Sequence, residues 1–428
     1  MAKISLIGAG SVTFARRLLQ DIVCVPELSD ATVSLMDTNP ERLALMSKFA
    51  NKLVRDTGTN IKIETTPDRR EALDGSDYVL TTIRVGDCYE RDIAIPLKYG
   101  VDQSVGDTVG PGGVFKALRT APVLMDICED IEDVAPDATL LNYTNPMAIA
   151  CWAIAEATSV PTIGLCHSVQ RTTLDLADYI GVSPDRVKGW VAGINHLAWF
   201  LRLEIDGQDA YPQLVEAMNN PEIFSRDTVR FEVMKQFGYF VTESTRHMSE
   251  YTPYFRTNEE TIEDFNLDQI PQYLQQYATR DDGNETQLLE DANTDKKLTA
   301  TRSEEYACRI IEAMESDRPT VINGNVPNEG LIDNLLNLSS VEVPILIDKL
   351  GFHPMAVGEL PGQLAALSRS NQAVQQLATL AILDGDREAA FHAIALDPLT
   401  SAVLSLGEIR AMFDEMWTAH GTELAAYS

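Results

Sequence analysis

Two short apolar runs near the middle of the sequence each end in a side chain that can bind a metal. Residues 162–165 lead into Cys166, and residues 191–194 lead into Asn195 and His196. A thiolate and an imidazole, with further positions open for substrate oxygens, are the donors of a catalytic rather than a structural metal site. Cys166 and His196 can meet only if the two runs lie side by side in a sheet or at its edge. Taken alone, a buried core cysteine and a hydrogen-bonded histidine would be the simpler interpretation.

The N-terminus has the order of elements that binds a dinucleotide. An apolar strand at residues 3–7 runs into Gly8 and Gly10, and a helix follows to about residue 23. The glycines permit a tight turn and let the backbone approach a pyrophosphate at the helix N-terminus. Thr13 stands where the third glycine of the usual motif would be, so the motif is imperfect. An ordinary α/β turn is the alternative interpretation.

Asp37 strengthens the case for a dinucleotide, because it ends the next predicted strand at residues 31–36. An acid at that position can accept a hydrogen bond from the ribose 2′-hydroxyl of NAD and disfavours the 2′-phosphate of NADP. The loop after a predicted strand at residues 77–83 faces the same side. The predicted cofactor contacts are Gly8, Gly10, Ser11, Val12, Asp37 and Arg84.

Two further segments should border the cofactor site. Residues 106–115 form a glycine-rich loop before a helix that starts near Lys116, and such a loop packs against a ligand, moves over one or is simply flexible. Asn145 follows a buried strand at residues 138–143. Ligands of open parallel sheets bind at the carboxyl ends of the strands, so we expect Asn145 to face the ligand.

Four strand–helix alternations in the first 150 residues predict a doubly wound parallel sheet. The predicted fold class is therefore α/β, with a Rossmann-like NAD-binding domain at residues 1–195 and a C-terminal α+β, largely helical domain at residues 196–428. Within the second domain, residues 257–297 are polar and acidic and should form exposed helices and loops, whereas residues 361–427 are expected to be mostly helical.

Composition restricts the partners of the chain. Its 428 residues are 45% hydrophobic, and 64 Asp and Glu against 34 Lys and Arg give a net charge of −30, which argues against nucleic acid or an anionic membrane as a partner. The six cysteines have no framework spacing, so we expect reduced thiols in a cytoplasmic protein. No signal peptide precedes the first strand, and the longest weakly polar run, residues 146–157, is too short to span a bilayer.

Eight stretches of the sequence, taken in order, form a pattern that is more specific than any single motif. They are residues 8–11, 106–113, 142–146, 166–170, 193–196, 237–244, 250–255 and 323–326. In these stretches the chain resembles glycoside hydrolase family 4, and within it most closely the α-galactosidases (melibiases). The resemblance covers essentially the whole chain.

The resemblance implies hydrolysis of α-galactosides by a route that differs from the two-carboxylate mechanism of most glycosidases. NAD⁺ would take a hydride from C3 of the sugar, and a divalent metal, usually Mn²⁺ in the family, would hold the C2 and C3 oxygens and polarise the ketone. A base could then remove the acidified C2 proton, the leaving group would depart from C1, water would add and NADH would return the hydride. α-Galacturonides or α-glucosides are the alternative substrates, and a homodimer or homotetramer is the implied assembly.

By the family's motifs, Cys166 and His196 correspond to the metal ligands. Tyr251 is implied as the base and is favoured over Tyr254. A tyrosine with a pKa of about 10 needs a nearby positive charge to act as a base at neutral pH, and the metal could supply that charge. His167 stands where phosphosugar-cleaving relatives often have an acid. The implied sugar contacts are Asn145, His167 and Tyr254, and the candidate acids are His167 and Asp107. Four histidines without motif context are interpreted as structural or surface residues: His247, His353, His392 and His420.

Two other classes of function are open. A simple NAD-dependent 2-hydroxyacid dehydrogenase would share the nucleotide fold, but it would need a catalytic His–Asp pair and a carboxylate-binding Arg, and it would consume NAD. A non-catalytic protein that senses NAD or a sugar would bind its ligand and release no product. The combination of Cys166, His196 and Tyr251 argues against the sensor.

Overall fold

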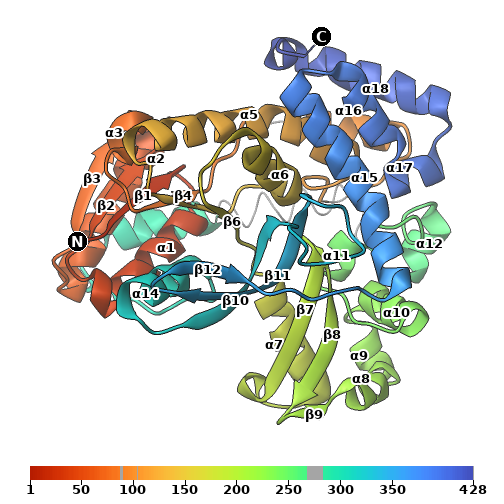
Figure 1. Ribbon diagram of the computed structural model, residues 1–428, viewed down its shortest axis with the longest axis horizontal. Coiled ribbons are helices and arrows are strands. Elements are labelled where there is room, and N and C mark those ends of the chain that lie inside the picture. The colour runs from red at the N-terminus through yellow and green to blue at the C-terminus, as the bar shows by residue number, and fades with distance from the viewer. Residues whose placement is uncertain (87–89, 104, 268–282, 428) are drawn as a thin grey trace.

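A mixed sheet of 12 strands is the framework of the computed structural model, which describes residues 1–86, 90–103, 105–267 and 283–427 (Figure 1). Its N-terminal part is parallel, in the order β3-β2-β1-β4-β5-β6. β1, β2, β4 and β5 are almost fully buried, as parallel strands covered on both faces should be. The bounds are β1 (Lys3–Ile7), β2 (Thr32–Met36), β3 (Lys62–Thr66), β4 (Tyr78–Thr81), β5 (Thr139–Asn142) and β6 (Thr162–Gly164).

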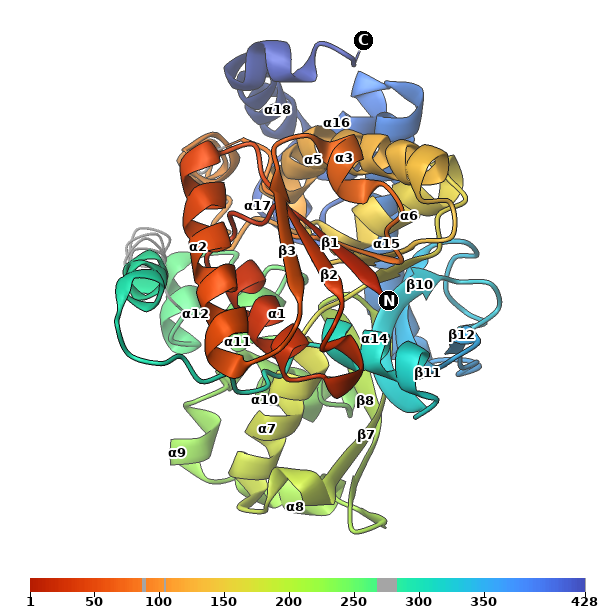
Figure 2. The ribbon, with the colours of Figure 1, turned by 90° about the vertical axis from the view of Figure 1, so that its left-hand side faces the viewer.

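Helices cover both faces of the parallel strands. α1, α2 and α14 pack on one face, whereas α3, α5 and α6 pack on the other (Figure 2). Leu6 and Leu80 contribute to the first core and Ile7 and Val79 to the second, because successive strand residues face opposite sides. The predicted doubly wound sheet is therefore confirmed. These helices are α1 (Phe14–Val23), α2 (Pro40–Thr57), α3 (Arg69–Leu73), α5 (Gly110–Val134), α6 (Met147–Ala157) and α14 (Ala307–Ser316).

Antiparallel strands from residue 187 onward extend the same sheet in the order β6-β10-β11-β7-β8-β9, with β12 beside β11. They are β7 (Val187–Ile194), β8 (Leu197–Ile205), β9 (Gln208–Asp209), β10 (Thr320–Pro327), β11 (Ser340–Asp348) and β12 (Gly351–Pro354). Cys166 follows β6 and His196 follows β7, so β10 and β11 lie between the two apolar runs. The expectation that these runs are neighbours was wrong, because strands from much later in the chain are inserted between them.

The remaining helices surround this sheet. α15 to α18 pack on α5 and α6 around a separate hydrophobic core, which confirms the largely helical C-terminal region (Figure 1). β7 and β8 form a hairpin around residue 195, and the domain boundary placed there stays a prediction. The helices are α4 (Ile95–Lys98), α7 (Ser168–Ile180), α8 (Tyr211–Met218), α9 (Pro221–Phe224), α10 (Thr228–Phe237), α11 (Thr245–Met248), α12 (Glu259–Asp264), α15 (Gly362–Asp384), α16 (Arg387–Ala395), α17 (Pro398–Val403) and α18 (Leu406–His420).

The glycine-rich segment differs from the predicted loop, because α5 begins at Gly110 rather than near Lys116. A Cβ atom on Gly112 would lie 2.4 Å from the carbonyl oxygen of Gly106, and one on Gly113 would lie 2.5 Å from the carbonyl carbon of Thr108. These glycines therefore let the first turn of α5 pack against the preceding loop, which fixes that loop in place.

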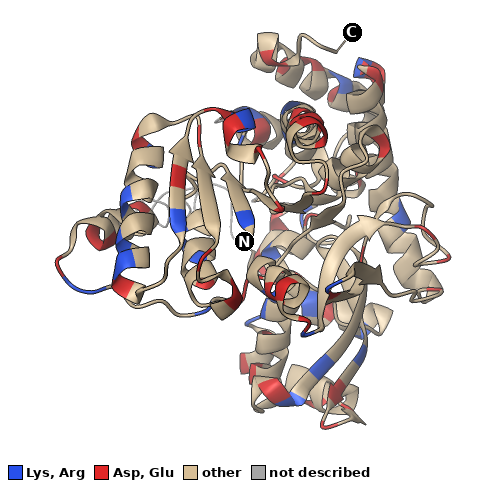
Figure 3. Ribbon diagram, turned by 60° about the vertical axis from the view of Figure 1, so that its left-hand side comes forward, with Lys and Arg blue, Asp and Glu red and all other residues tan. Residues whose placement is uncertain are grey.

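Charge and membrane properties follow the composition. Acidic positions lie on helices of both halves of the chain, with basic positions among them (Figure 3). None of the helices in the described residues combines the length and apolar character that a membrane span requires.

Residues 268–282 of the acidic segment and Cys88 lie outside the described residues. The free cysteines are Cys24, Cys128, Cys151, Cys166 and Cys308.

Candidate active site

A cavity of about 730 Å³ opens at the carboxyl ends of β1, β2, β4 and β5. Asp37 lines the end beside β2, whereas Asp107, Lys116 and Asn145 line the same cavity from α5, its preceding loop and the end of β5. The cavity therefore extends from Asp37 to Asn145 and can accommodate an extended ligand. All six predicted cofactor contacts line it: Gly8, Gly10, Ser11, Val12, Asp37 and Arg84.

The glycine turn and Asp37 hold each other in a fixed geometry. The backbone N–H of Gly10 donates to Oδ2 of Asp37 at 2.7 Å, and that of Asn39 donates to Oδ1 at 2.8 Å. A Cβ atom on Gly10 would lie 2.7 Å from Asp37 Oδ2, and one on Gly8, whose φ is +89°, would lie 2.9 Å from the carbonyl oxygen of Thr82. Side chains at either glycine would therefore disrupt the turn.

Three residues form a cluster that could hold a metal ion. One ligand atom each from Cys166, His196 and Glu243 lies within 4.8 Å of the others. His196 and Glu243 have positive φ values of 62° and 75°, a conformation that non-glycine residues adopt rarely and mostly where function requires it. The structure thus brings the two predicted ligands together and adds Glu243, which the sequence analysis placed in a family stretch without giving it a role.

His247, interpreted from the sequence as a structural or surface residue, is buried and contacts His196. Its Nε2 lies 3.3 Å from Nδ1 of His196, whereas Nε2 of His196 lies 3.5 Å from Oε2 of Glu243. Burial and the neighbouring His196 lower the pKa of His247 to about 4, so the ring is neutral at pH 7. A contact to the far ring nitrogen is the usual way in which a ligating histidine is held.

Tyr251 lies next to this cluster and Tyr254 does not share its environment. The Tyr251 ring centroid is 5.3 Å from that of His247, and its side chain is 1% exposed. Its hydroxyl has no hydrogen-bond partner among the described residues. Burial and the nearby acids, Glu243 foremost, raise its pKa well above the usual value. Tyr254 is 49% exposed and contacts Phe237; its role as a sugar contact stays a prediction.

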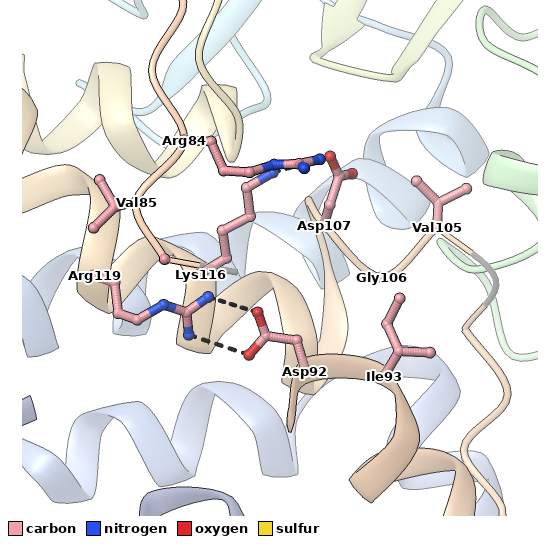
Figure 4. A pocket seen from close by; sticks show the side chains of 10 residues that line it. Arg84, Val85, Asp92, Ile93, Val105, Gly106, Asp107, Lys116 and Arg119 are labelled. Carbon is pink, nitrogen blue, oxygen red and sulfur yellow. Dashed lines mark hydrogen bonds and ion pairs between the residues drawn. The ribbon is translucent and has the colours of Figure 1, made fainter. Parts of the chain in front are cut away.

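Asp107 is held as an anion by a cationic neighbour. Nζ of Lys116 lies 3.1 Å from Oδ2 of Asp107, and Figure 4 shows the charged ends of Lys116 and Arg84 directed at this carboxylate. Burial alone would raise the pKa of Asp107, but the charge of Lys116 outweighs it and holds the pKa well below its usual range. An ionised carboxylate is a poor proton donor at neutral pH, so the role of Asp107 as an acid is not favoured by its surroundings.

His167, the other candidate acid, directly follows Cys166 and precedes the first turn of α7. Its side chain is 42% exposed, and its Nδ1 lies 3.8 Å from Oε1 of Glu305. A half-exposed imidazole beside the metal cluster could exchange protons with solvent and with a ligand. The roles of His167 and Asn145 toward a substrate stay predictions.

Glu250 ties the loop that carries Asp107 to the segment that carries Tyr251. Its buried carboxylate accepts hydrogen bonds from the backbone N–H groups of Val105 at 2.6 Å and Gly106 at 3.1 Å. Arg256 lies beside it and also donates to Asp102 at 3.0 Å. The sequence analysis gave no function to Glu250, although it lies in a family stretch.

Replacing Glu250 with glutamine should loosen this loop, because the amide can accept from only one of the two N–H groups. Leaving one buried donor unpaired should lower the free energy of unfolding by roughly 1–3 kcal/mol. Hydrogen exchange at the amides of Val105 and Gly106, together with thermal unfolding, measures the effect. Glu216→Gln, on the exposed face of α8, is the matched control. Unchanged exchange at both amides would show that Glu250 does not hold the loop.

Known proteins resemble this chain over its full length. The chain is 42% identical to an α-galactosidase of Bacillus subtilis (strain 168), with all of both chains covered, and 37% identical to an α-galactosidase of Rhizobium meliloti (strain 1021), with 100% of this chain and 90% of the relative covered. A 6-phospho-α-glucosidase from gut microorganisms, solved with NAD and Mn²⁺, has the same fold, with a TM-score of 0.83, 20% identity and coverage of 99% and 98%.

Both halves of the chain match one family. Residues 3–182 match the family described as family 4 glycosyl hydrolase, and residues 191–400 match the family 4 glycosyl hydrolase C-terminal domain. Since these matches and the full-length α-galactosidase relatives cover nearly the whole chain, the chain belongs to glycosyl hydrolase family 4.

Proposed function

We propose that the chain is an α-galactosidase that works with bound NAD and a divalent metal, Mn²⁺ or a similar cation. The observation that carries the proposal is the cluster of Cys166, His196 and Glu243 beside the unpaired hydroxyl of Tyr251. The choice of an α-galactoside rests on two α-galactosidases that are 37–42% identical over the full length of the chain.

The residues present fit both groups. A thiolate, an imidazole and a carboxylate suit a divalent transition-metal ion, and three ligands leave positions for sugar oxygens. The buried Tyr251 hydroxyl, unpaired among the described residues, is the kind of group that a bound ligand would satisfy. For NAD, the fixed turn at Gly8 and Gly10 and a cavity of about 730 Å³ are appropriate in shape and size.

The side chains divide the work of the reaction. When bound, NAD would accept and return a hydride at C3 of the sugar while the metal polarises the C3 oxygen. Tyr251 would take the proton from C2, since its hydroxyl is buried beside the metal ligands and is not engaged elsewhere in the described residues. His167 and Asp107 are the two candidate donors of a proton to the leaving group: Lys116 holds Asp107 ionised, and burial lowers the pKa of His167.

The remaining contacts bind rather than react. Asp37, already oriented by two backbone N–H groups, would accept a hydrogen bond from the ribose of NAD and disfavour NADP. Asn145, at the carboxyl end of β5, would bond sugar hydroxyls. We further propose a homodimer or homotetramer in the cytoplasm, in line with the family resemblance and with cysteines that have no disulfide framework spacing.

Release of p-nitrophenol from p-nitrophenyl α-D-galactoside tests the function directly. The expected result is release that requires NAD⁺, Mn²⁺ and a thiol reductant together, with no net change in NAD. Release from the corresponding glucoside or galacturonide instead would keep the mechanism and change the sugar. Release without NAD⁺ from protein stripped of nucleotide would overturn the proposal, and net reduction of NAD⁺ would favour a dehydrogenase.

A further inference from the structure

A buried carboxyl lies beneath the metal cluster without a hydrogen-bond partner. Glu342 of β11 is 0% exposed, and neither oxygen of its side chain is hydrogen-bonded within the described residues. Asn195, the residue before His196, is 1% exposed, and both polar atoms of its amide are unpaired in the same part of the chain. These two side chains together have four buried polar atoms without a regular hydrogen-bond partner, which is uncommon in a folded protein.

The sheet itself directs Glu342 to the cluster. One row of paired residues connects the strands that end at the two predicted ligands: Gly164, Asn325, Glu342 and Gly193. Cys166 follows the first residue of this row by two positions, and His196 follows the last by three. Glu342 interacts electrostatically with Cys166, His196 and Glu243, and the amide of Asn195 approaches its carboxyl group without reaching the geometry of a regular hydrogen bond.

An arrangement of this kind makes the empty protein less stable. A buried polar group without a partner destabilises the folded state, and a charged one does so more strongly. A cation held by Cys166, His196 and Glu243 would supply the missing opposite charge, and its water ligands would supply the missing hydrogen-bond donors and acceptors. The side chain of Glu342 is not needed for strand pairing, since β11 pairs through its backbone with β10 on one side and β7 on the other.

We propose that Glu342 and Asn195 form the floor of the metal site and are positioning residues that strengthen the binding of a divalent cation through its outer coordination shell. This inference rests on the proposed metal dependence. It predicts opposite effects of the Glu342 side chain on two quantities: the side chain lowers the stability of the metal-free protein and raises the affinity for the cation.

Glu342→Gln and Glu342→Met, both close in size to the native residue, test the trade on the full-length protein. Free Mn²⁺, counted by its electron paramagnetic resonance signal during titration, gives the affinity without any measurement of activity. We expect each variant to bind Mn²⁺ at least about 10-fold more weakly, as outer-shell changes usually do. We also expect the metal-free Met variant to have a higher Tm than the metal-free wild type, because an unpaired polar group is removed.

Asp130→Asn is the matched control, since Asp130 of α5 is also a buried acid but is paired with Arg69 and Arg70 of α3. It should lower Tm and leave Mn²⁺ affinity unchanged. Unchanged Mn²⁺ affinity in both Glu342 variants would overturn the inference, as would a lower Tm in both metal-free variants. If wild-type protein binds no Mn²⁺, Co²⁺ or Zn²⁺, the proposed metal dependence fails as well, which separates the two failures.

Discussion

Turnover of an α-galactoside should fall by about 1,000-fold in Tyr251→Phe, because proton transfer by a positioned base typically contributes 100- to 10,000-fold. Only the hydroxyl is removed, and this hydroxyl makes no hydrogen bond within the described residues. The ring contacts to His247 and His196 remain. The variant should therefore unfold at the same temperature as the wild type or at a higher one, which separates a chemical role from a structural one.

Exchange at C2 of the sugar identifies the step that fails. In D₂O, wild-type protein should release galactose that carries deuterium at C2, because the base returns a deuteron taken from the solvent. Tyr251→Phe should release almost no galactose with deuterium at C2. Tyr254→Phe is the comparison variant: since Tyr254 is 49% exposed and is a predicted sugar contact rather than the base, its change should raise KM and leave deuterium incorporation at C2 intact. A large loss in Tyr254→Phe with full activity in Tyr251→Phe would move the base to the second tyrosine.

The fold of the candidate nucleotide-binding half could be predicted from the sequence because its signals are local. A strand, a glycine turn and a helix lie within residues 3–23, and the acid that completes the site is 14 residues further on. Local signals also define α2 at residues 40–57, where Asn39 caps the N-terminus and Gly58, with φ of +78°, ends the helix. Each of these features follows from backbone chemistry at neighbouring residues.

The cluster that could hold a metal was predicted only in part, because its members are distant in sequence. Cys166 and His196 were found because each ends an apolar run, and the family stretches supported them. Glu243, His247 and Glu342 come from a loop, a four-residue helix and an antiparallel strand, and none has a local pattern that indicates a ligand. Their roles depend on β10 and β11 lying between β6 and β7, which no periodicity in the sequence indicates.

The glycine-rich segment shows how the same residues can support two interpretations. Many glycines in succession suggest mobility, but Gly112 and Gly113 are required because backbone atoms of Gly106 and Thr108 occupy the space of a side chain. Sequence alone does not distinguish a glycine that permits motion from one that permits close packing, because the difference lies in the neighbouring backbone. The consequence is a fixed position for Asp107 beside Lys116.

Cys166→Ala should remove the metal and, with it, about 1,000-fold or more of the turnover. Polarisation of a sugar oxygen by a cation contributes several kcal/mol, and each 1.36 kcal/mol is about 10-fold in rate. Burial, together with Glu243 and Glu342, raises the pKa of the Cys166 thiol well above its usual value. A thiolate at this position therefore requires a bound cation, and metal binding should release a proton.

Proton release reports the same site without any substrate. Adding Mn²⁺ to metal-free wild-type protein in a weakly buffered indicator solution should release about one proton from the buried Cys166 thiol, and Cys166→Ala should release none. Cys128→Ala is the matched control: Cys128 is buried in the core between α5 and the sheet, so its loss should lower stability and leave Mn²⁺ affinity unchanged. Full activity after chelation, or in Cys166→Ala, would contradict the site, because no other pair of described residues places a thiol and an imidazole in a cluster that could hold a metal.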